Sequence, residues 1–575
     1  MKFLGLYTNL LIIFTFILLT TLIHHCSVCC SAGSIVERIR PRSFWSHNMD
    51  KTALPSLATI TLDDIASGLD ENRFTSVDLV RAYIARIHEV NQHVNAVLEI
   101  NPDAIDIAQK LDSERRRQGR RGPLHGVPIL LKDNLYTLDR MNTSAGSYAL
   151  LGSKASREGT AVERLRSAGA ILLGKANLSE WANFRSQRAT DGWSARGGQT
   201  YAPFVPLQAS EGSSSGSAVS TILGLAAVSL ATETDGSIVG PSKMSSVVGL
   251  RTTTGLVPRD GIVPLSDRQD TIGPIARTVK DAAYLLSVIA GPSDYDDATS
   301  SFPFPQVPDY LAACRGTDLT GIRLGVPRSS IISKDPNVLK SFEHALQRLK
   351  SAGASVVDNV TFRSESEWNG WDSSEKKRAL EAEFKASIER WCKALVYNPH
   401  NIKTVADIIQ FAQNHPQELY LERDVGRQVS SRDSPGIDAE VTQLALKKML
   451  RCCGKDGILG ALEDYNVDAL VFPNDYNMPA TFAARAGMPV LALPLGFYPE
   501  GTQMKETEFG HQVEVGPNVP YGLLFTAEHY SEIKLLKLAY AFEQLWPLSS
   551  YSRLHIQPKT ELAGVIAQGD RLKGL

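Results

Sequence analysis

Residues 211–250 read EGSSSGSAVSTILGLAAVSLATETDGSIVGPSKMSSVVGL, and they are the most informative stretch of the chain. Two loops of small residues, Gly212–Ser217 and Thr232–Ile238, flank the almost uncharged segment Ala218–Leu230. This segment predicts a buried helix that leads into a short strand. Glycines let a backbone approach a ligand closely and adopt positive φ. Since functional groups tend to sit on loops held by a rigid scaffold, we expect chemistry where these two loops meet.

Strand and helix patterns alternate in the sequence around this stretch. Gly126–Asn134 predicts a buried strand, and Lys132 lies near its end. Ala161–Ala168 predicts a helix, and Ile171–Gly174 predicts a further strand. Such alternation is typical of an α/β fold with a largely parallel sheet covered by helices. The charged, helical pattern of residues 365–453 predicts a helical insertion beside this sheet.

The composition is that of an ordinary globular protein, with 575 residues, 43% of them hydrophobic and 21% charged. The formal net charge of −2 indicates neither nucleic acid nor an anionic membrane surface as a main partner. We expect one catalytic domain over residues 57–548 and a polar C-terminal tail over residues 549–575. The sequence leaves the oligomeric state open.

The N-terminus has the pattern of a secretory signal peptide. Lys2 precedes an uncharged apolar run from Phe3 to Ile23, and small residues follow up to Ala32. We expect residues 1–32 to be cleaved as a signal peptide, which places the protein in the secretory pathway. The run is also long enough to stay in a bilayer as an uncleaved anchor, and only then is a membrane a partner. Residues 33–56 predict a polar tether.

The remaining cysteines and the glycosylation patterns fit that compartment. Four cysteines lie beyond the leader, and they are Cys314, Cys392, Cys452 and Cys453. They permit one or two disulfides, with the pairing open, and their spacing is not that of a structural zinc site. Three segments match the N-glycosylation pattern, at Asn142, Asn177 and Asn359. We expect Asn359 to be the most exposed of the three and Asn177 to be buried.

Lys132 is the first candidate catalytic residue. It lies at the end of an apolar strand, where a side chain can point into a cleft. A buried lysine has a lowered pKa, so it can be neutral and act as a base. The alternative is that Lys132 reaches solvent or pairs with its neighbour Asp133.

Ser237 is the second candidate. It follows a glycine turn that aims backbone N–H groups of Thr234, Asp235, Gly236 and Ser237 at one point, which favours an oxyanion. The alternative is a serine that only caps a helix. For residues 213–217 the alternative is a flexible linker, but the apolar segment that follows argues against a linker in solvent.

The run Gly212–Gly216 also matches the G-x-S-x-G nucleophile elbow of α/β-hydrolases. That motif has to follow a buried strand, whereas the preceding residues 202–207 contain two prolines. An α/β-hydrolase is therefore disfavoured.

Several motifs in one order resemble the amidase signature family, and the peptide amidase-like branch within it most closely. They are GVPILLKDN (126–134), GKANLSEWANFRS (174–186), WSARGGQT (193–200), GSSSGS (212–217), TETDGSIVGPS (232–242), VVGL (247–250), DTIGPIARTVKDAA (270–283), AGMPVLALPLGF (486–497) and LLKLAYAFEQ (535–544). The resemblance runs from about residue 60 to 545 and is weak between about 300 and 460.

The resemblance implies a large mixed β-sheet sandwiched between helices and an amidase that acts on linear carboxamides. Its triad would be Lys132, Ser213 on a cis peptide and Ser237 as the nucleophile that forms an acyl-enzyme, with no cofactor or metal. Backbone N–H groups of Thr234 through Ser237 would form the oxyanion hole, and a backbone contact to the small-molecule or peptide substrate would fall near Ala182. The first expectation is a primary amide that releases ammonia.

The sequence departs from the broad family pattern at four places: Glu211 where a glycine is usual, Thr232–Ser237 where Thr-Asp-x-Gly-Gly-Ser is usual, Lys243 and its neighbours, and Arg251-Thr252 where Lys-Pro is expected. The second of these suits the peptide amidase-like branch. These departures bear on substrate preference more than on the triad. Two alternatives remain, a catalytically silent amidase-like binding protein and the glutaminase-type subunit of an aminoacyl-tRNA amidotransferase.

Overall fold

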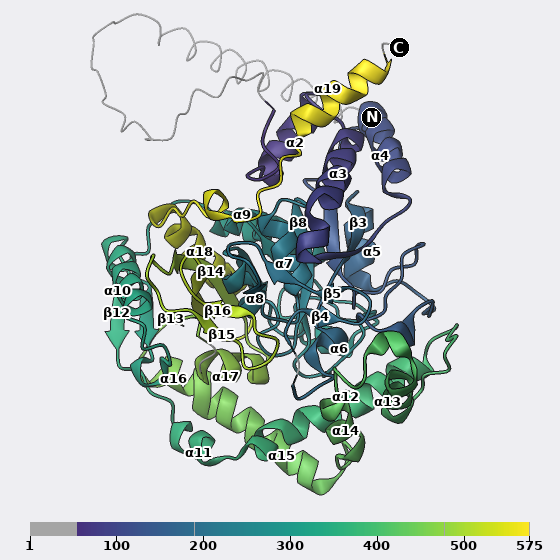
Figure 1. The fold of residues 1–575 in the computed structure, drawn as a ribbon. Helices are drawn as coiled ribbons and strands as arrows, with labels where there is room; N and C mark the ends of the chain where they lie inside the picture. Colours follow the sequence, from purple (N-terminus) through teal and green to yellow (C-terminus); the bar gives the residue numbers. More distant parts are fainter. Residues whose placement is uncertain (1–53, 189, 476–477, 574–575) are drawn as a thin grey trace, which may run out of the picture. The chain divides into compact units, whose positions relative to one another are not determined.

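The computed structural model describes residues 54–188, 190–475 and 478–573 (Figure 1). The predicted signal peptide or anchor at residues 1–32 and most of the predicted tether lie outside these residues. No helix within the described ranges combines the length and the apolar character needed to cross a bilayer.

One large sheet organises the described residues. Across the sheet its strands are β1 (Val97–Ile100), β3 (Ile171–Ala176), β2 (Pro128–Lys132), β8 (Val228–Glu233), β10 (Thr271–Ala276), β9 (Val248–Arg251), β14 (Val490–Phe497), β17 (Pro520–Thr526), β13 (Ala469–Pro473), β11 (Arg323–Val326) and β12 (Ser355–Asp358). The sheet is mixed, because β3–β2–β8 and β13–β11–β12 run parallel whereas all strand pairs between β8 and β13 are antiparallel. The predicted α/β fold with a large mixed sheet is confirmed.

The prediction of a largely parallel sheet from helix–strand alternation was wrong. Three strands that make the centre antiparallel, β9, β10 and β17, were not predicted. Each contains a glycine or proline inside the strand, in the sequences VGLR, TIGPIA and PYGLLFT. Such residues weaken the pattern by which a strand is recognised.

The helices of the first half of the chain are α2 (Leu62–Asp70), α3 (Ser76–Val94), α4 (Ala104–Gln118), α5 (Thr160–Ser167), α6 (Glu180–Asn183), α7 (Ser215–Ile222), α8 (Val239–Met244) and α9 (Val279–Ile289). Those of the second half are α10 (Pro336–Ser351), α11 (Glu365–Gly370), α12 (Ser373–Lys393), α13 (Val405–Asn414), α14 (Gly426–Asp433), α15 (Glu440–Leu450), a π-helix (Arg451–Ile458), α16 (Leu459–Asp464), α17 (Met478–Ala486), α18 (Glu532–Leu545) and α19 (Leu562–Lys573).

Short strands form two smaller sheets. One contains β15 (Lys505–Glu506), β16 (Val513–Val515), β7 (Gln208–Ala209) and β6 (Tyr201–Ala202), and the other contains β4 (Trp193–Ser194) and β5 (Gly198–Gln199).

The serine-rich stretch forms α7 and β8, and both elements are buried. α7 begins inside the serine run, at Ser215, and all of its residues are buried. β8 pairs parallel with β2, so that Leu131 lies opposite Leu230. Because parallel strands end at the same edge of a sheet, this pairing brings Lys132 at the end of β2 next to the loop that follows β8.

Residues 365–450 form the five helices α11 to α15 and contain no strand. In Figure 1 these helices form a band beside the large sheet, and α12 and α14 lie on the side of α6. The apolar faces of α12 and α13 form a separate core, to which Phe384, Ile388 and Ile408 contribute together with Phe184. The helical region is thus packed onto the loops that surround the carboxyl end of β2 and β8.

The segment after residue 549, expected as a polar tail, packs against the body of the protein. α19 lies against α3, and its first residue, Leu562, is fully buried. The Arg86 guanidinium donates hydrogen bonds to the Thr560 carbonyl at 2.6 Å and to Glu561 Oε1 at 3.2 Å. A buried arginine on α3 therefore fixes a segment whose polar composition alone gives no sign of packing.

The four cysteines of the described residues, Cys314, Cys392, Cys452 and Cys453, are buried and free. The glycosylation patterns differ in exposure. Asn359 is exposed on the loop after β12, whereas Asn142 is half-buried. Asn177 is fully buried, and its side chain donates to the Asn95 and Gly198 carbonyls. The expected order of exposure is confirmed.

Candidate active site

Lys132 and Ser213 meet in the interior of the protein. Lys132 Nζ lies 2.7 Å from Ser213 Oγ and donates to the Thr232 carbonyl at 2.9 Å. The lysine side chain is completely buried. Burial lowers the pKa of Lys132 to about 7, and the charges of Glu233 and Asp270 oppose this effect. The alternatives in which Lys132 reaches solvent or pairs with Asp133 do not describe this structure.

The two serine loops touch each other through the backbone. The Gly212–Ser213 peptide bond is cis, and the Ser214 N–H donates to the Ser237 carbonyl at 3.1 Å. Ser237 itself is 6% exposed and lines a cavity. Within the described residues its hydroxyl makes no hydrogen bond, so the hydroxyl is free to meet a ligand.

Glu233 holds the turn that carries Ser237. Its carboxylate accepts hydrogen bonds from the backbone N–H groups of Gly236 at 3.0 Å, Ile238 at 2.6 Å and Val239 at 3.1 Å. The predicted oxyanion hole therefore needs a correction at Gly236, because its N–H is taken by Glu233. No other described group accepts the N–H groups of Thr234, Asp235 and Ser237, and all three residues line the cavity.

Arg251, which departs from the family pattern, is a structural residue. It is fully buried, and within the described residues its guanidinium donates hydrogen bonds to five backbone carbonyls and forms an ion pair of 3.8 Å with Glu233. Two of these carbonyls belong to Glu233 and Thr234, and the others belong to Gln269, Ala484 and Met488. Arg251 thus fixes the loop before Ser237 from the side away from the cavity, which it does not line.

Ala182 lies in an unusual turn at the cavity wall. Three successive residues have positive φ, namely Trp181 (53°), Ala182 (50°) and Asn183 (73°). A non-glycine residue in this conformation costs on the order of 1–3 kcal/mol, so neighbouring groups have to hold it. The Asn183 side chain donates to Asp191 at 2.6 Å, and buried Arg185 pairs with Glu180 at 2.6 Å.

The cavity that Ser237 lines has a volume of about 240 Å³. One part of its wall comes from loops of the sheet, which contribute Ala182, Asn183, Phe184, Gln187, Gly212, Thr234, Asp235, Ser237 and Leu265. The other part comes from helices, which contribute Lys377, Leu380, Glu381, Arg427, Thr481 and Arg485. Sequence reasoning named Ala182, Thr234, Asp235 and Ser237 of the first part. It missed the second part, because the residues that α12, α14 and α17 contribute lie outside the recognised motifs.

Glu211 and Lys243, read separately as departures from the family pattern, form one ion pair of 2.5 Å. Both side chains are largely buried, with 12% and 14% exposed. Glu211 has a φ of 50°, a conformation that glycine adopts without strain. The pair links the residue before the cis peptide to α8, which follows Ser237. The positive charge of Lys243 therefore compensates the negative charge that Glu211 introduces in place of a glycine.

The amidase family model matches residues 78–536. This chain belongs to the amidase family. A relative from Arthroderma benhamiae, which is described as an amidase, is 41% identical over 89% of this chain and 90% of its own length. The solved peptide amidase of Stenotrophomonas maltophilia is 38% identical, with a TM-score of 0.76 over 88% of this chain and 100% of that one.

A more partial match is a glutamyl-tRNA(Gln) amidotransferase subunit of Chloroflexus aurantiacus, which is 38% identical over 53% of this chain and 61% of its own length. The chain is thus an amidase with the fold of the peptide amidases, as the sequence motifs predicted.

Removal of one partner of the Glu211–Lys243 pair tests its role in stability. Lys243→Met leaves a buried carboxylate without its cation, and we expect the Tm to fall by about 2–4 °C. The double variant Glu211→Gln, Lys243→Met is expected to recover most of this loss in scanning calorimetry. Lys280→Met, which breaks a half-exposed pair with Asp63, is the control and should change the Tm little. Equal losses in the single and double variants would contradict the coupling.

Proposed function

We propose that this amidase hydrolyses primary carboxamides and releases ammonia, with Ser237 as the nucleophile. The observation that carries the proposal is a completely buried lysine whose Nζ lies 2.7 Å from the Ser213 hydroxyl, beside the loop that presents Ser237 to a cavity. A lysine with a pKa of about 7 is largely neutral at slightly alkaline pH, so it can accept a proton.

In the proposed mechanism the proton moves along the line Ser237, Ser213, Lys132. Ser213 passes its own proton to the neutral amine of Lys132 as it takes the proton of Ser237. Ser237 Oγ then attacks the amide carbonyl carbon and forms a tetrahedral intermediate. The contact between the two hydroxyls closes when substrate is bound, as catalytic hydrogen bonds often do.

The negative oxygen of that intermediate needs hydrogen-bond donors. We assign this role to the backbone N–H groups of Thr234, Asp235 and Ser237, which line the cavity without another acceptor. One such donor is worth about 3 kcal/mol of activation free energy. Lys132 returns its proton through Ser213 to the leaving nitrogen, ammonia departs and water hydrolyses the acyl-enzyme by the same path.

The cavity supports a substrate with an apolar acyl group, such as a C-terminally amidated peptide. Phe184, Leu265 and Leu380 supply apolar wall, whereas Glu381 and Arg427 are polar groups at the helical side. A solved peptide amidase that is 38% identical to this chain binds chymostatin as a competitive inhibitor. A cavity of about 240 Å³ holds a short acyl portion rather than a long chain.

Ammonia release by the mature chain tests this proposal. We expect Ser237→Ala and Lys132→Met to lower kcat by about 10⁴-fold or more on amidated peptides or simple acyl amides. Ser217→Ala removes a buried hydroxyl outside the site and is the matched control that keeps its activity. The assay includes glutamine, because turnover of glutamine alone would favour the glutaminase-type alternative. If no amide releases ammonia and a fluorophosphonate does not label Ser237, the result would favour a binding protein.

The pH dependence tests the role of Lys132. Its pKa in the folded protein is about 7, below the ordinary value of 10.5. Protonated lysine cannot accept a proton, so the acylation rate is expected to fall by about tenfold per pH unit below pH 7 and to level off above it. Single-turnover kinetics measure this rate. An acylation rate that stays constant down to pH 5 would exclude a lysine base with this pKa.

We also propose that the protein passes through the secretory pathway and carries a glycan at Asn359. The apolar leader and the exposed position of Asn359 support this proposal. Secreted protein is expected to shift in electrophoresis after peptide N-glycosidase treatment, and Asn359→Gln should remove the shift. Asn177→Gln serves as the control because that side chain is buried. A shift that survives Asn359→Gln would refute the assignment.

A further inference from the structure

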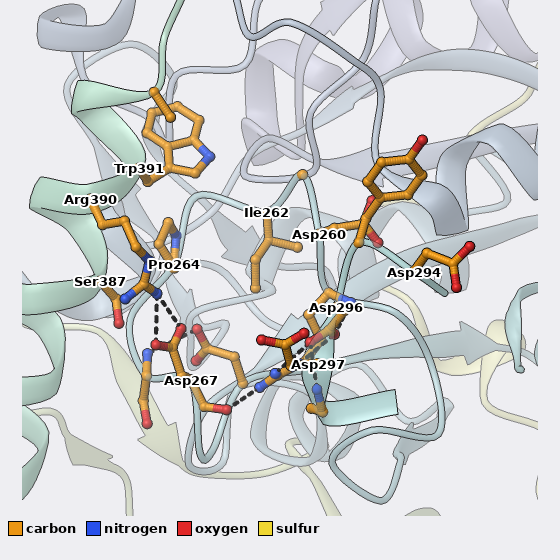
Figure 2. Close-up of a pocket in the computed structure, with 17 residues that line it drawn as sticks. Asp260, Ile262, Pro264, Asp267, Asp294, Asp296, Asp297, Ser387, Arg390 and Trp391 are labelled. Atoms are coloured by element: carbon orange, nitrogen blue, oxygen red, sulfur yellow. Dashed lines mark hydrogen bonds and ion pairs between the residues drawn. The ribbon is translucent and has the colours of Figure 1, made fainter. Parts of the chain in front are cut away.

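The largest of the cavities described, with a volume of about 850 Å³, contains none of the proposed catalytic residues. Its wall carries six aspartates, at positions 260, 267, 270, 294, 296 and 297, and Figure 2 shows most of them. Three of them pair with arginines, in the pairs Asp260–Arg157, Asp267–Arg390 and Asp296–Arg259. These ion pairs explain much of the acidic wall without a ligand.

Asp270 differs from these neighbours. It is 4% exposed and makes no ion pair with any described residue. Its Oδ1 accepts a hydrogen bond from Thr234 Oγ1 at 2.6 Å. Its Oδ2 accepts the backbone N–H groups of Leu265 at 2.7 Å and Ser266 at 2.9 Å. Burial raises the pKa of Asp270, and these hydrogen bonds favour its charged form.

Two of the three residues that Asp270 holds belong to the other cavity. Thr234 and Leu265 both line the cavity of Ser237. Thr234 is fixed at two points, because its hydroxyl donates to Asp270 and its carbonyl accepts from Arg251 at 3.2 Å. With both points fixed, the N–H of Thr234 keeps one direction. Asp270 thus forms part of the wall between the two cavities and aligns the loop before Ser237.

Asp270 also lies at the same edge of the sheet as Lys132. It immediately precedes β10, whose Thr271 is opposite Glu233 of β8, and the other neighbour of β8 is β2, which ends at Lys132. Glu233 and Asp270 are the two carboxylates whose charges favour the protonated form of that lysine against the effect of burial. Both are buried, so solvent and salt screen their fields little. Glu233 is committed to the turn of Ser237, whereas Asp270 lies outside that turn and can be changed separately.

We propose that Asp270 is a positioning residue of the amidase reaction, which acts through Thr234 on the oxyanion hole and through its charge on Lys132. The inference rests on the proposed function, in which Ser237 is activated by Lys132. Asp270 touches neither substrate nor the reacting atoms. Its two effects are separable, because one depends on a hydrogen bond and the other on a charge.

The central variant is Asp270→Asn. A turned asparagine keeps all three contacts, since its oxygen accepts the two backbone N–H groups and its nitrogen donates to the Thr234 hydroxyl. The variant therefore removes the charge and leaves the shape. The readout is the rate of Ser237 labelling by a fluorophosphonate between pH 5 and 9, which needs no knowledge of the natural substrate.

We expect Asp270→Asn to move the midpoint of the acid limb to lower pH by about half a unit or more, because loss of a negative charge makes Lys132 harder to protonate. Thr234→Val removes the hydrogen bond and keeps the charge. It is expected to lower the plateau rate by about tenfold, since a misaligned oxyanion donor is lost in part, with an unchanged midpoint.

Two control variants come from the same acidic cavity. Asp267→Asn makes the same change of charge at an exposed pair and should leave both midpoint and plateau unchanged. Asp296→Asn breaks a buried pair with Arg259, so it lowers the Tm but not the midpoint. The second control separates loss of stability from the specific effect on Lys132.

The outcomes are distinct. Wild-type labelling together with an unchanged midpoint and plateau in folded Asp270→Asn would overturn this inference alone. An equal shift of the midpoint in Asp267→Asn would also overturn it, as a general effect of net charge. If Asp270→Asn does not fold, Thr234→Val decides, and a plateau like that of the wild type refutes the positioning role. No labelling of the wild type would overturn the proposed function and this inference with it.

Discussion

The burial of Lys132 is the constraint on which the rest of the structure depends. A lysine at the surface stays charged at neutral pH, and only removal from water brings its pKa to about 7. Removal from water is costly unless the amine finds hydrogen-bond partners, and here Ser213 and the Thr232 carbonyl supply them. Both partners depend on β2 and β8 being parallel neighbours inside the sheet, so the topology of the sheet sets the chemistry of one amine.

Buried charges also shape the loop that carries Ser237, in a complementary way. The Glu233 carboxylate accepts hydrogen bonds from backbone N–H groups, and the Arg251 guanidinium donates hydrogen bonds to backbone carbonyls. Hydrogen bonds to charged groups contribute about 1.5–3 kcal/mol each, enough to hold a turn rich in glycine and serine in one conformation. Because Glu233 takes the N–H of Gly236, it also decides which donors remain for a substrate. The loop therefore derives its rigidity from charges that never face solvent.

Local sequence patterns predicted most of the elements that surround the site, including the strand of Lys132, the helix–strand unit after the serine run and the helices of residues 365–453. They did not predict the antiparallel centre, because pairing between β9, β10 and β14 depends on contacts between distant segments. They did not pair Glu211 with Lys243 for the same reason. Two charged residues next to apolar segments, Glu233 and Arg251, were the signals in the sequence for the network around Ser237, and the structure places them at the ends of the buried strands β8 and β9.

The two parts of the cavity wall have different origins, and this division separates reactivity from selectivity. Lys132, Ser213 and Ser237 depend on the sheet, whose packing leaves little freedom for substitution. The helical side, with Glu381 and Arg427, depends on α12 and α14, which pack against that site. Arg427 donates to the Asn183 carbonyl at 2.8 Å, but within the described residues neither helix makes a hydrogen bond to the three proposed catalytic side chains. Contacts remote from the reacting bond supply binding energy that selects a substrate. Exchange of helical residues can therefore change the acyl group that is accepted while the environment of Lys132 stays the same.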